Sequence, residues 1–448
     1  MAGSTDIKSH EYKILSNIDD LIRLHRESDW LAERRRDALH QYSESKLPIR
    51  VSSLWRYTDP KTFEIEDYNL DPITSLIEEV GSSKNTFRNI NLEGISARCY
   101  IGDGFFRKTI LDKGLAKYGV EVLDLHEASF SHKELVEQYL GSIVGPSFGR
   151  LEAFSYAAWN NGVFIYVPDK VQVEKPIHLL TSQSKPNSCK TSRLLVVLGE
   201  GASLTLIDEM GEGFDESESS TYANSVAEIF IGNGARIKYV PLQNLNQNTS
   251  FYFTQRAKLG SDAYLETVLV SLGSKASKVD CGSILNGPGA ESNIFCLGVG
   301  NNKQHFDHHT LQNHIVGHTK SDLKFKIALN DSANSIYTGL IRIGENAPYS
   351  EAYQENRNLI LSALANTETI PELEILNNEV RCTHGATVGK VDPQEVFYLR
   401  SRGIKNNEAI NLIVEGFIEP IVKYVPDTIK ERFNSVIIDK LGVYKNDR

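Results

Sequence analysis

The sequence has few cysteines and no CxxC pair. Its five cysteines, Cys99, Cys189, Cys281, Cys296 and Cys382, are scattered along 448 residues. An odd, scattered set is typical of free thiols in a reducing compartment and argues against a disulfide framework. We therefore expect a cytoplasmic protein, or a protein of the plastid stroma if a transit peptide has been removed.

Long apolar runs and basic clusters are also missing. No stretch approaches the roughly 20 apolar residues of a membrane-spanning helix. The N-terminal "MAGSTDIKSHEYK" has no apolar core of a secretory signal. The formal net charge is -10, and the one basic run, "AERRRDAL", lies among acidic residues. We expect neither a membrane nor a nucleic acid as a partner.

The motifs of nucleotide binding and hydrolysis are absent. There is no GxxxxGK[ST] phosphate loop, and "GEGAS" and "GNGAR" lack the third glycine of a dinucleotide fingerprint. A chain of this kind is not expected to hydrolyse ATP itself. No GxSxG elbow and no evident pair of catalytic carboxylates occur either, so we expect a protein that is not an enzyme.

From about Trp159 to Gly385 the chain consists of short strands separated by tight turns. One turn phrase recurs, in which a Gly, Asn, Asp or Ser cluster precedes an alanine and a new strand. The alanines are Ala202, Ala235, Ala263, Ala290 and Ala333, and their spacings are 33, 28, 27 and 43 residues. Such a period in strands alone indicates a repetitive all-β fold. A β-sandwich is an alternative, but small residues at repeated corners favour a β-helix, although the spacing drifts.

The two ends of the chain have helical patterns in place of the strand pattern of the middle. Residues 1–155 predict a helical and mixed domain, with a charged amphipathic helix from Ile18 to Ala38 and shorter helices near 71–80 and 131–140. The β-helix core is predicted over 156–387. Residues 388–448 predict a helical domain whose first helix is capped by Asp392 and ends at Gly403.

The two later C-terminal helices carry apolar stripes that three short helices cannot bury among themselves. They must pack on the β body or on another protein. The residues that we assign to partner docking are Phe417, Ile421, Ile429 and Phe433.

Five histidines gather in "HFDHHTLQNHIVGH", at positions 305, 308, 309, 314 and 318. Imidazole is a common metal ligand, so a metal site in an enzyme, over His305–His318, is the alternative function. Against it, His308 and His309 would point to opposite faces of a strand, and no HExxH or two-His-one-carboxylate pattern is present.

Cys382 and His384 are separated by one residue in "VRCTHGATVGKV". Residues i and i+2 of a strand lie on the same face, so the pair is a candidate site. Two ligands leave a metal half-coordinated, however, because a zinc or iron–sulfur site needs about four. Other residues, such as those of a second chain, would have to complete it.

The segment "PELEILNNEVRCTHGATVGKVDPQEVFYLRSRGI" resembles the hallmark of the SufD branch of the SufB/SufD family, scaffold subunits of SUF iron–sulfur cluster assembly. "NRNLILSALANTETIP", "DLKFKIALNDSANSIYTGLIRI" and "LWRYTDP" resemble the same family. The resemblance implies a right-handed parallel β-helix flanked by helical parts.

It also implies partners and a site. A SufB-like subunit would pair through the β-helix edges, and a SufC-like ABC-type ATPase would dock on the C-terminal helices. The isolated chain could form a homodimer. By motif match, His384 would lie at the interface where the cluster is assembled, with Cys382 as a weaker neighbour. The resemblance implies no tightly bound cofactor, only a transient iron–sulfur cluster or iron at that interface.

Overall fold

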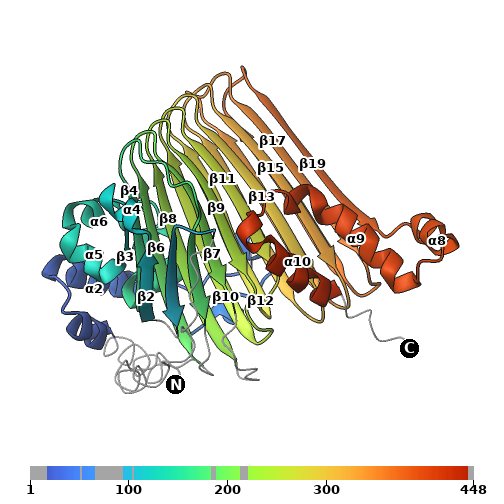
Figure 1. The fold of residues 1–448 in the computed structure, drawn as a ribbon, viewed down its shortest axis with the longest axis horizontal. Helices are drawn as coiled ribbons and strands as arrows, with labels where there is room; N and C mark the ends of the chain where they lie inside the picture. The colour runs from blue at the N-terminus through green and yellow to red at the C-terminus, as the bar shows by residue number, and fades with distance from the viewer. Residues whose placement is uncertain are drawn as a thin grey trace.

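The computed structural model describes residues 18–50, 53–65, 94–102, 105–182, 188–211 and 220–441. Two sheets of mostly parallel strands form a long β-helix, with helices packed outside it near both ends of the chain (Figure 1). The predicted β-helix is confirmed, and the sandwich alternative is wrong.

From β4 onward, successive strands alternate between the two sheets, so the chain winds in coils. In spatial order, sheet 1 contains β19 (Arg381–Lys390), β17 (Glu351–Ile360), β15 (Lys320–Leu329), β13 (Glu291–Gly300), β11 (Tyr264–Ser271), β9 (Arg236–Gln243), β7 (Ser203–Met210), β5 (Ile177–Ser182), β1 (Ala97–Gly102) and β2 (Phe105–Leu111). Sheet 2 contains β18 (Asn366–Ile375), β16 (Asn334–Ile343), β14 (His305–His314), β12 (Ala276–Leu285), β10 (Thr249–Leu259), β8 (Thr221–Ile231), β6 (Cys189–Leu198), β4 (Asn161–Val167) and β3 (Glu121–Asp124). Only the β1–β2 and β3–β4 pairs are antiparallel among the described strands.

The recurrent alanines stack at one corner of the coils. Ala202, Ala235, Ala263 and Ala290 are all at most 1% exposed. The residue after each corner donates its N–H to the corner carbonyl of the preceding coil, as in Tyr264 to Ala235 at 2.9 Å. A larger side chain would collide with the next coil, which explains why small residues recur there.

Ala333 does not belong to this row, which corrects the predicted spacing. It precedes β16 and therefore lies where the chain enters sheet 2, at the opposite corner. The row continues instead with Thr319 and Ser350, both 0% exposed, whose carbonyls accept from the next coil at 2.9 and 3.0 Å. The spacings that follow Ala290 are then 29 and 31 residues, so the step of 43 residues came from mixing two corners.

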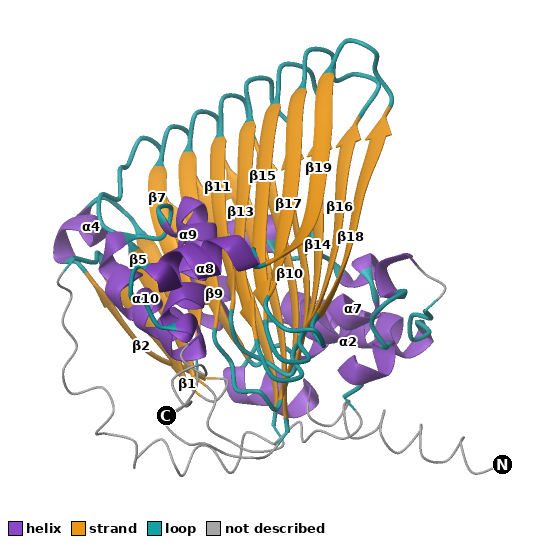
Figure 2. Ribbon diagram, turned by 90° about the vertical axis from the view of Figure 1, so that its right-hand side faces the viewer, coloured by secondary structure: helices purple, strands orange, loops and turns teal. Residues whose placement is uncertain are grey.

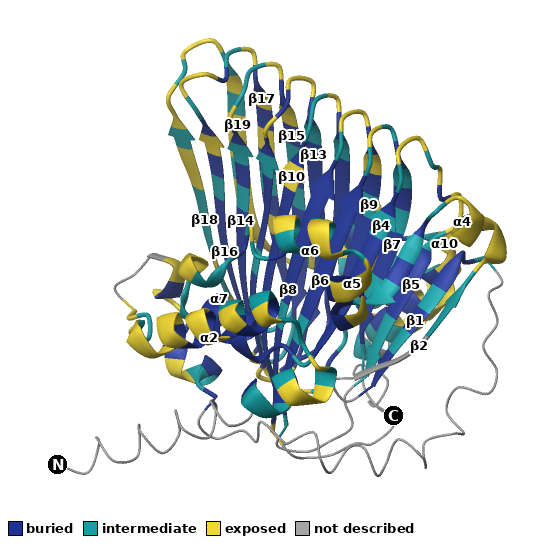
Figure 3. Cartoon of the chain, turned by 90° about the vertical axis from the view of Figure 1, so that its left-hand side faces the viewer, coloured by how far each residue is buried: buried dark blue, intermediate teal, exposed yellow. Residues whose placement is uncertain are grey.

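The N-terminal helices cover part of the outer face of sheet 2 (Figure 3). Among the described residues they are the helical stretch 18–25, α2 (Asp29–Glu44), η1 (Ser53–Trp55), η2 (Pro60–Phe63), α5 (Leu125–Ser131), α6 (Lys133–Tyr139), η3 (Pro146–Phe148) and α7 (Arg150–Ala158). The short helix α4 (Lys113–Lys117) lies apart from them, and its Leu115 packs against the interior of the β-helix. The helix predicted near 71–80 lies outside the described residues. The helix predicted near 131–140 corresponds to α6, which begins at Lys133 with His132 at its N-cap, because the preceding helix α5 continues through Ser131.

The C-terminal helices are α8 (Pro393–Ser401), α9 (Asn406–Val422) and α10 (Asp427–Leu441). Asp392 accepts from the Gln394 N–H at 2.8 Å, and Gly403 follows the end of α8 with a φ of 88°, as the capping pattern predicts. Helices α9 and α10 pack on the outer face of sheet 1. No helix in the described part of the chain has the length and apolarity to span a membrane.

Candidate functional site: the free end of the β-helix

The β-helix ends in an uncovered coil. β18 and β19 are each the last strand of their sheet, so each has one edge with no neighbouring strand among the described residues (Figure 2). Apolar side chains are exposed around this end: Leu364 74%, Leu373 37%, Ile375 40%, Leu376 50% and Val388 53%. Open edges and exposed apolar residues are what a second chain can cover.

The parallel register sets the direction in which the candidate pair points. Cys382 pairs with Ala352 and His384 with Gln354, residues of β17 that are both buried. Because register neighbours in a sheet project to the same face, Cys382 and His384 project toward the interior of the coil. The described part of the chain has no further coil beyond them, and His384 is exposed at the open end.

The two candidates differ in chemistry. Cys382 is half-buried and packs against the apolar cluster of Ile341, Ile343 and Ala347. Burial raises the pKa of its thiol to about 11. Since the thiolate is the metal ligand and nucleophile, Cys382 is poorly prepared for either role in the isolated chain. His384 presents an accessible imidazole and is the stronger candidate.

The two free edges also differ. The Arg381 N–H donates to Ser350 in the preceding coil at 3.0 Å. In a parallel ladder alternate residues turn their N–H groups to the same side. The N–H groups of residues 382, 384, 386 and 388 therefore face the free edge of β19. On β18, the Asn366 N–H donates to the Ala333 carbonyl, on the side of β16. By the same alternation, residue 371 faces the free edge of β18, and because it is a proline it has no N–H to offer there. Only the β19 edge offers its full row of donors.

The four predicted docking residues face the chain's own sheet. Ile421, Ile429 and Phe433 are at most 7% exposed within the cluster formed with sheet 1. The half-buried Phe417 lies under the Lys326 ammonium, 4.8 Å from its ring centroid. These side chains thus fill an intramolecular interface. The exposed large residues on these helices are instead Phe397 at 72%, Tyr398 at 53%, Leu412 at 44% and Ile438 at 45%.

The histidine cluster does not form a metal site. His308 points inward to Ser271 Oγ at 2.8 Å, and His309 points outward to Asp307 at 2.7 Å. His314 bonds Thr319 and Ser321. In the described ranges, no group of three or more His, Cys, Asp or Glu side chains is arranged to hold a metal ion. The metal site that the alternative function places over His305–His318 is therefore not formed by the described side chains.

The outward histidines have a different role, which the sequence did not reveal. Asp307 is held by Lys278 Nζ at 2.8 Å and by Thr58. His305 also bonds Thr58, at 2.8 Å. This buried ionic cluster anchors the segment around Trp55 to sheet 2, where Lys278 lies 4.6 Å from the Trp55 ring centroid. It is a structural anchor for the N-terminal region.

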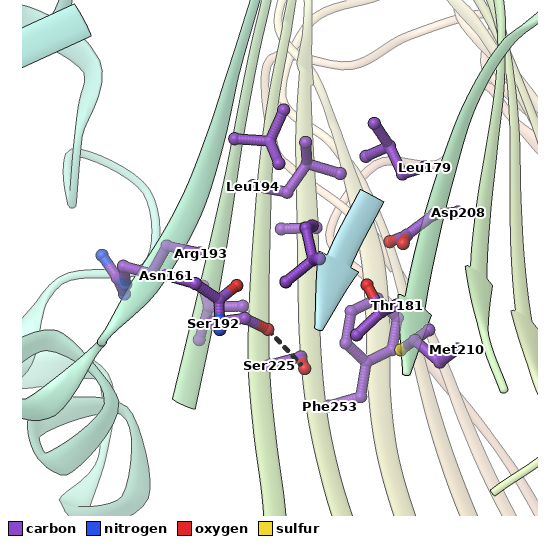
Figure 4. Close-up of a pocket in the computed structure, with 14 residues that line it drawn as sticks. Asn161, Leu179, Thr181, Ser192, Arg193, Leu194, Asp208, Met210, Ser225 and Phe253 are labelled. Carbon is purple, nitrogen blue, oxygen red and sulfur yellow. Dashed lines mark hydrogen bonds between the residues drawn. The ribbon is translucent and has the colours of Figure 1, made fainter. Parts of the chain in front are cut away.

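A small pocket lies toward the other end of the β-helix (Figure 4). Its volume is about 30 Å³, and Thr181, Ser192, Asp208 and Ser225 line it. Burial raises the pKa of Asp208 to about 6, and the Tyr239 hydroxyl lies 2.8 Å from the carboxylate. A space of this size holds a water molecule, so we do not regard it as a substrate site.

The free end of the β-helix thus combines an open strand edge, exposed apolar side chains and an accessible imidazole. A family model described as the SUF system FeS cluster assembly SufBD core domain matches residues 179–417. A model of the SufBD protein N-terminal region matches residues 9–179. The chain belongs to the SufB/SufD family of iron–sulfur cluster assembly proteins.

Curated relatives support the same assignment. An iron–sulfur cluster assembly SufBD family protein of Staphylococcus saprophyticus is 26% identical over 436 residues, covering 94% of this chain and 91% of the relative. The iron–sulfur cluster assembly protein SufB of Bacillus subtilis is similar to the same extent, 26% over 436 residues, with 94% and 91% coverage. The similarity spans almost the whole length of both chains.

Proposed function

We propose that this chain is a non-catalytic, SufD-like scaffold subunit that builds iron–sulfur clusters together with a SufB-like subunit. The observation that carries the proposal is His384, an exposed imidazole on the open edge strand of a SufB/SufD-family β-helix. A second chain added to that edge would bring its own ligands beside His384. The site would then be complete only in the pair, and iron and sulfide are its substrates.

Pairing is proposed to use β19 in preference to β18. The β19 edge has a complete row of free N–H groups, whereas Pro371 interrupts the row on β18. An added strand gains main-chain hydrogen bonds along its length. It would also cover Val388 and the other exposed apolar side chains of the free end. The same edge provides a surface for a homodimer when the partner is absent.

A SufC-like ATPase is proposed to dock on the exposed side of the C-terminal helices. No residue of α8 is buried, and Phe397 and Tyr398 of this helix are exposed. The chain has no phosphate loop of its own. Aromatic residues in the centre of an interface carry much of its binding energy, so α8 is the natural anchor.

The SufD assignment within the family rests on the phrase "CTHGATVG" at Cys382–Gly389. SufB-type chains typically carry a different phrase at this place. A cytoplasmic or plastid-stromal location follows from the proposed role, since cluster assembly and free thiols both require a reducing compartment.

Substituting His384→Ala tests the proposed role. We expect the variant to pair normally with its SufB-like partner but to yield several-fold less cluster, since an imidazole ligand is lost. Native mass measurement of the co-expressed chains reports pairing, and the visible absorbance of the reconstituted complex reports the cluster yield. The matched control is His40→Ala, which removes an exposed histidine on α2. An unchanged cluster yield with His384→Ala would remove His384 from the chemistry.

A further inference from the structure

The interior of the β-helix changes from apolar to polar just before the free end. The inward residues of β15 include Leu323, Phe325 and Ile327, all 0% exposed. At the equivalent places on β17, the register puts Gln354, Asn356 and Asn358. These three are between 0 and 3% exposed. Burying amides costs free energy unless they find hydrogen-bond partners.

Gln354 is held in a specific orientation. Its Nε2 donates to the Gly339 carbonyl across the coil at 3.2 Å. A carbonyl can only accept, so this bond fixes which end of the amide is nitrogen. A Cβ at Gly339 would collide with the Gln354 Nε2 and with the Tyr337 hydroxyl. Glycine in mid-strand thus makes room for the amide, and Tyr337 is itself held by Thr310 at 3.0 Å.

The other end of this amide has no partner. Gln354 Oε1 is buried and makes no hydrogen bond among the described residues. Its register neighbour on β19 is His384, which projects from the same face of the sheet. Neighbouring strands are about 4.8 Å apart, so long side chains of register neighbours can reach hydrogen-bond distance. The unused acceptor is therefore on the strand position beside His384, whose imidazole carries one N–H when neutral. The structure shows no bond between the two side chains, so the exposed ring has to rotate toward Oε1 in order to donate.

We propose that Gln354 is the positioning residue of His384: its Oε1 accepts one ring N–H, selects the tautomer and turns the other nitrogen toward the open edge. The inference rests on the proposed role of His384. A neutral imidazole binds a metal through the nitrogen without a proton, and the partner of the other nitrogen fixes the ring. Gln354 would then present that lone pair to iron before the partner chain arrives.

The test is the tautomer ratio of His384, measured by ¹⁵N NMR of histidine-labelled full-length chain at a pH where the ring is neutral. We expect one N–H to dominate in the wild type. Gln354→Met should shift the ratio by roughly fivefold to tenfold, the effect of one hydrogen bond. Gly339→Ala keeps the amide but displaces it and should cause a shift in the same direction. Asn358→Leu removes an amide of the same row that is not adjacent to His384 and should leave the ratio unchanged.

Two outcomes would overturn the inference: a wild-type ratio equal to that of the exposed His40 in the same spectrum, or a ratio unaffected by Gln354→Met. Thermal unfolding of each variant separates a loss of fold from a loss of orientation. The measurement needs no partner and no iron. A normal tautomer response with unchanged cluster yield in His384→Ala would therefore reject the proposed function and leave the positioning intact.

Discussion

At the scale of single residues, the interior of the β-helix holds histidines that are kept neutral. Burial lowers the pKa of His308 to about 4, and that of His314 to about 4. The unfolded pKa of histidine is about 6.5. Between pH 6.5 and 4 the unfolded chain binds protons that the folded chain does not. Stability therefore falls as the pH is lowered through this window.

We predict that protonation of His308 alone lowers the free energy of unfolding by about 2 kcal/mol when the pH falls from 7 to 5. Urea unfolding of the wild type and of His308→Gln at the two pH values measures it. The variant should be less stable at pH 7, because its bond to Ser271 is altered, but it should lose less on acidification. His40→Gln, an exposed change, should keep the wild-type pH dependence. Equal pH slopes for wild type and His308→Gln would contradict the prediction.

At the scale of elements, the corner row shows how a turn phrase specifies a coil. Ala263 is 1% exposed and lies between Ala235 and Ala290 of the neighbouring coils. We predict that Ala263→Val destabilises the chain by about 1–3 kcal/mol, because added methyl groups have no space between stacked corners. Denaturant unfolding measures this. Lys258→Val, on an exposed position of β10, should change stability by less than about 0.5 kcal/mol. Similar losses for both variants would show that the corner is not tightly packed.

The C-terminal helices show that an apolar stripe does not identify its own partner. Phe433 and Ile437 fill the interface with sheet 1, and Arg432 forms an ion pair with Glu209 of β7. The exposed aromatic residues are on α8. A partner that docks without unfolding this interface has to use the exposed sides of the three C-terminal helices, where, in the described part of the chain, α8 alone presents exposed aromatic residues.

We predict that Phe397→Asp weakens binding of a SufC-like ATPase by tenfold or more, as loss of an aromatic anchor does. The fold should be intact, since Phe397 is 72% exposed. Titration calorimetry with the purified ATPase gives the affinity. Ile438→Asp, at an exposed position on α10, is the matched control and should bind normally. Retained affinity in Phe397→Asp would place the docking surface elsewhere.

At the scale of the whole molecule, the two ends of the β-helix are not equivalent. The antiparallel strands β2 and β3 close the N-terminal end. The C-terminal end is left with two free edges and exposed apolar residues. An open end of this kind is an aggregation hazard unless another chain covers it. This end is therefore the surface on which the proposed partner subunit would pair.

We predict that Ala386→Pro prevents pairing with a SufB-like subunit and leaves the monomer folded. The Ala386 N–H faces the free edge, so proline removes a donor for the partner and no bond within the coil. Native mass measurement should show monomer in place of the pair. Ala386→Val keeps the N–H and should pair. Thr387→Pro, at a position that bonds to β17, should instead destabilise the chain. Normal pairing of Ala386→Pro would exclude the β19 edge.

The sequence by itself determined the features that depend on neighbouring residues. Strand alternation, small corner residues and the Asp392 cap each act over a few positions, and the β-helix and the start of α8 followed from them. Even the error at Ala333 was one of register between two corners that look alike locally. The strand position and the shared face of Cys382 and His384 were predictable for the same reason.

Only the tertiary structure decided which groups meet. Gln354 and His384 are separated by one coil of about 30 residues, and nothing near either residue shows that they are adjacent. Sheet 1 covers the stripe from Phe417 to Phe433. One edge of β19 has no neighbouring strand among the described residues. Both facts depend on how the coils stack and where they stop. Packing between distant segments sets these contacts, because burial rewards any complementary surface regardless of its distance along the chain.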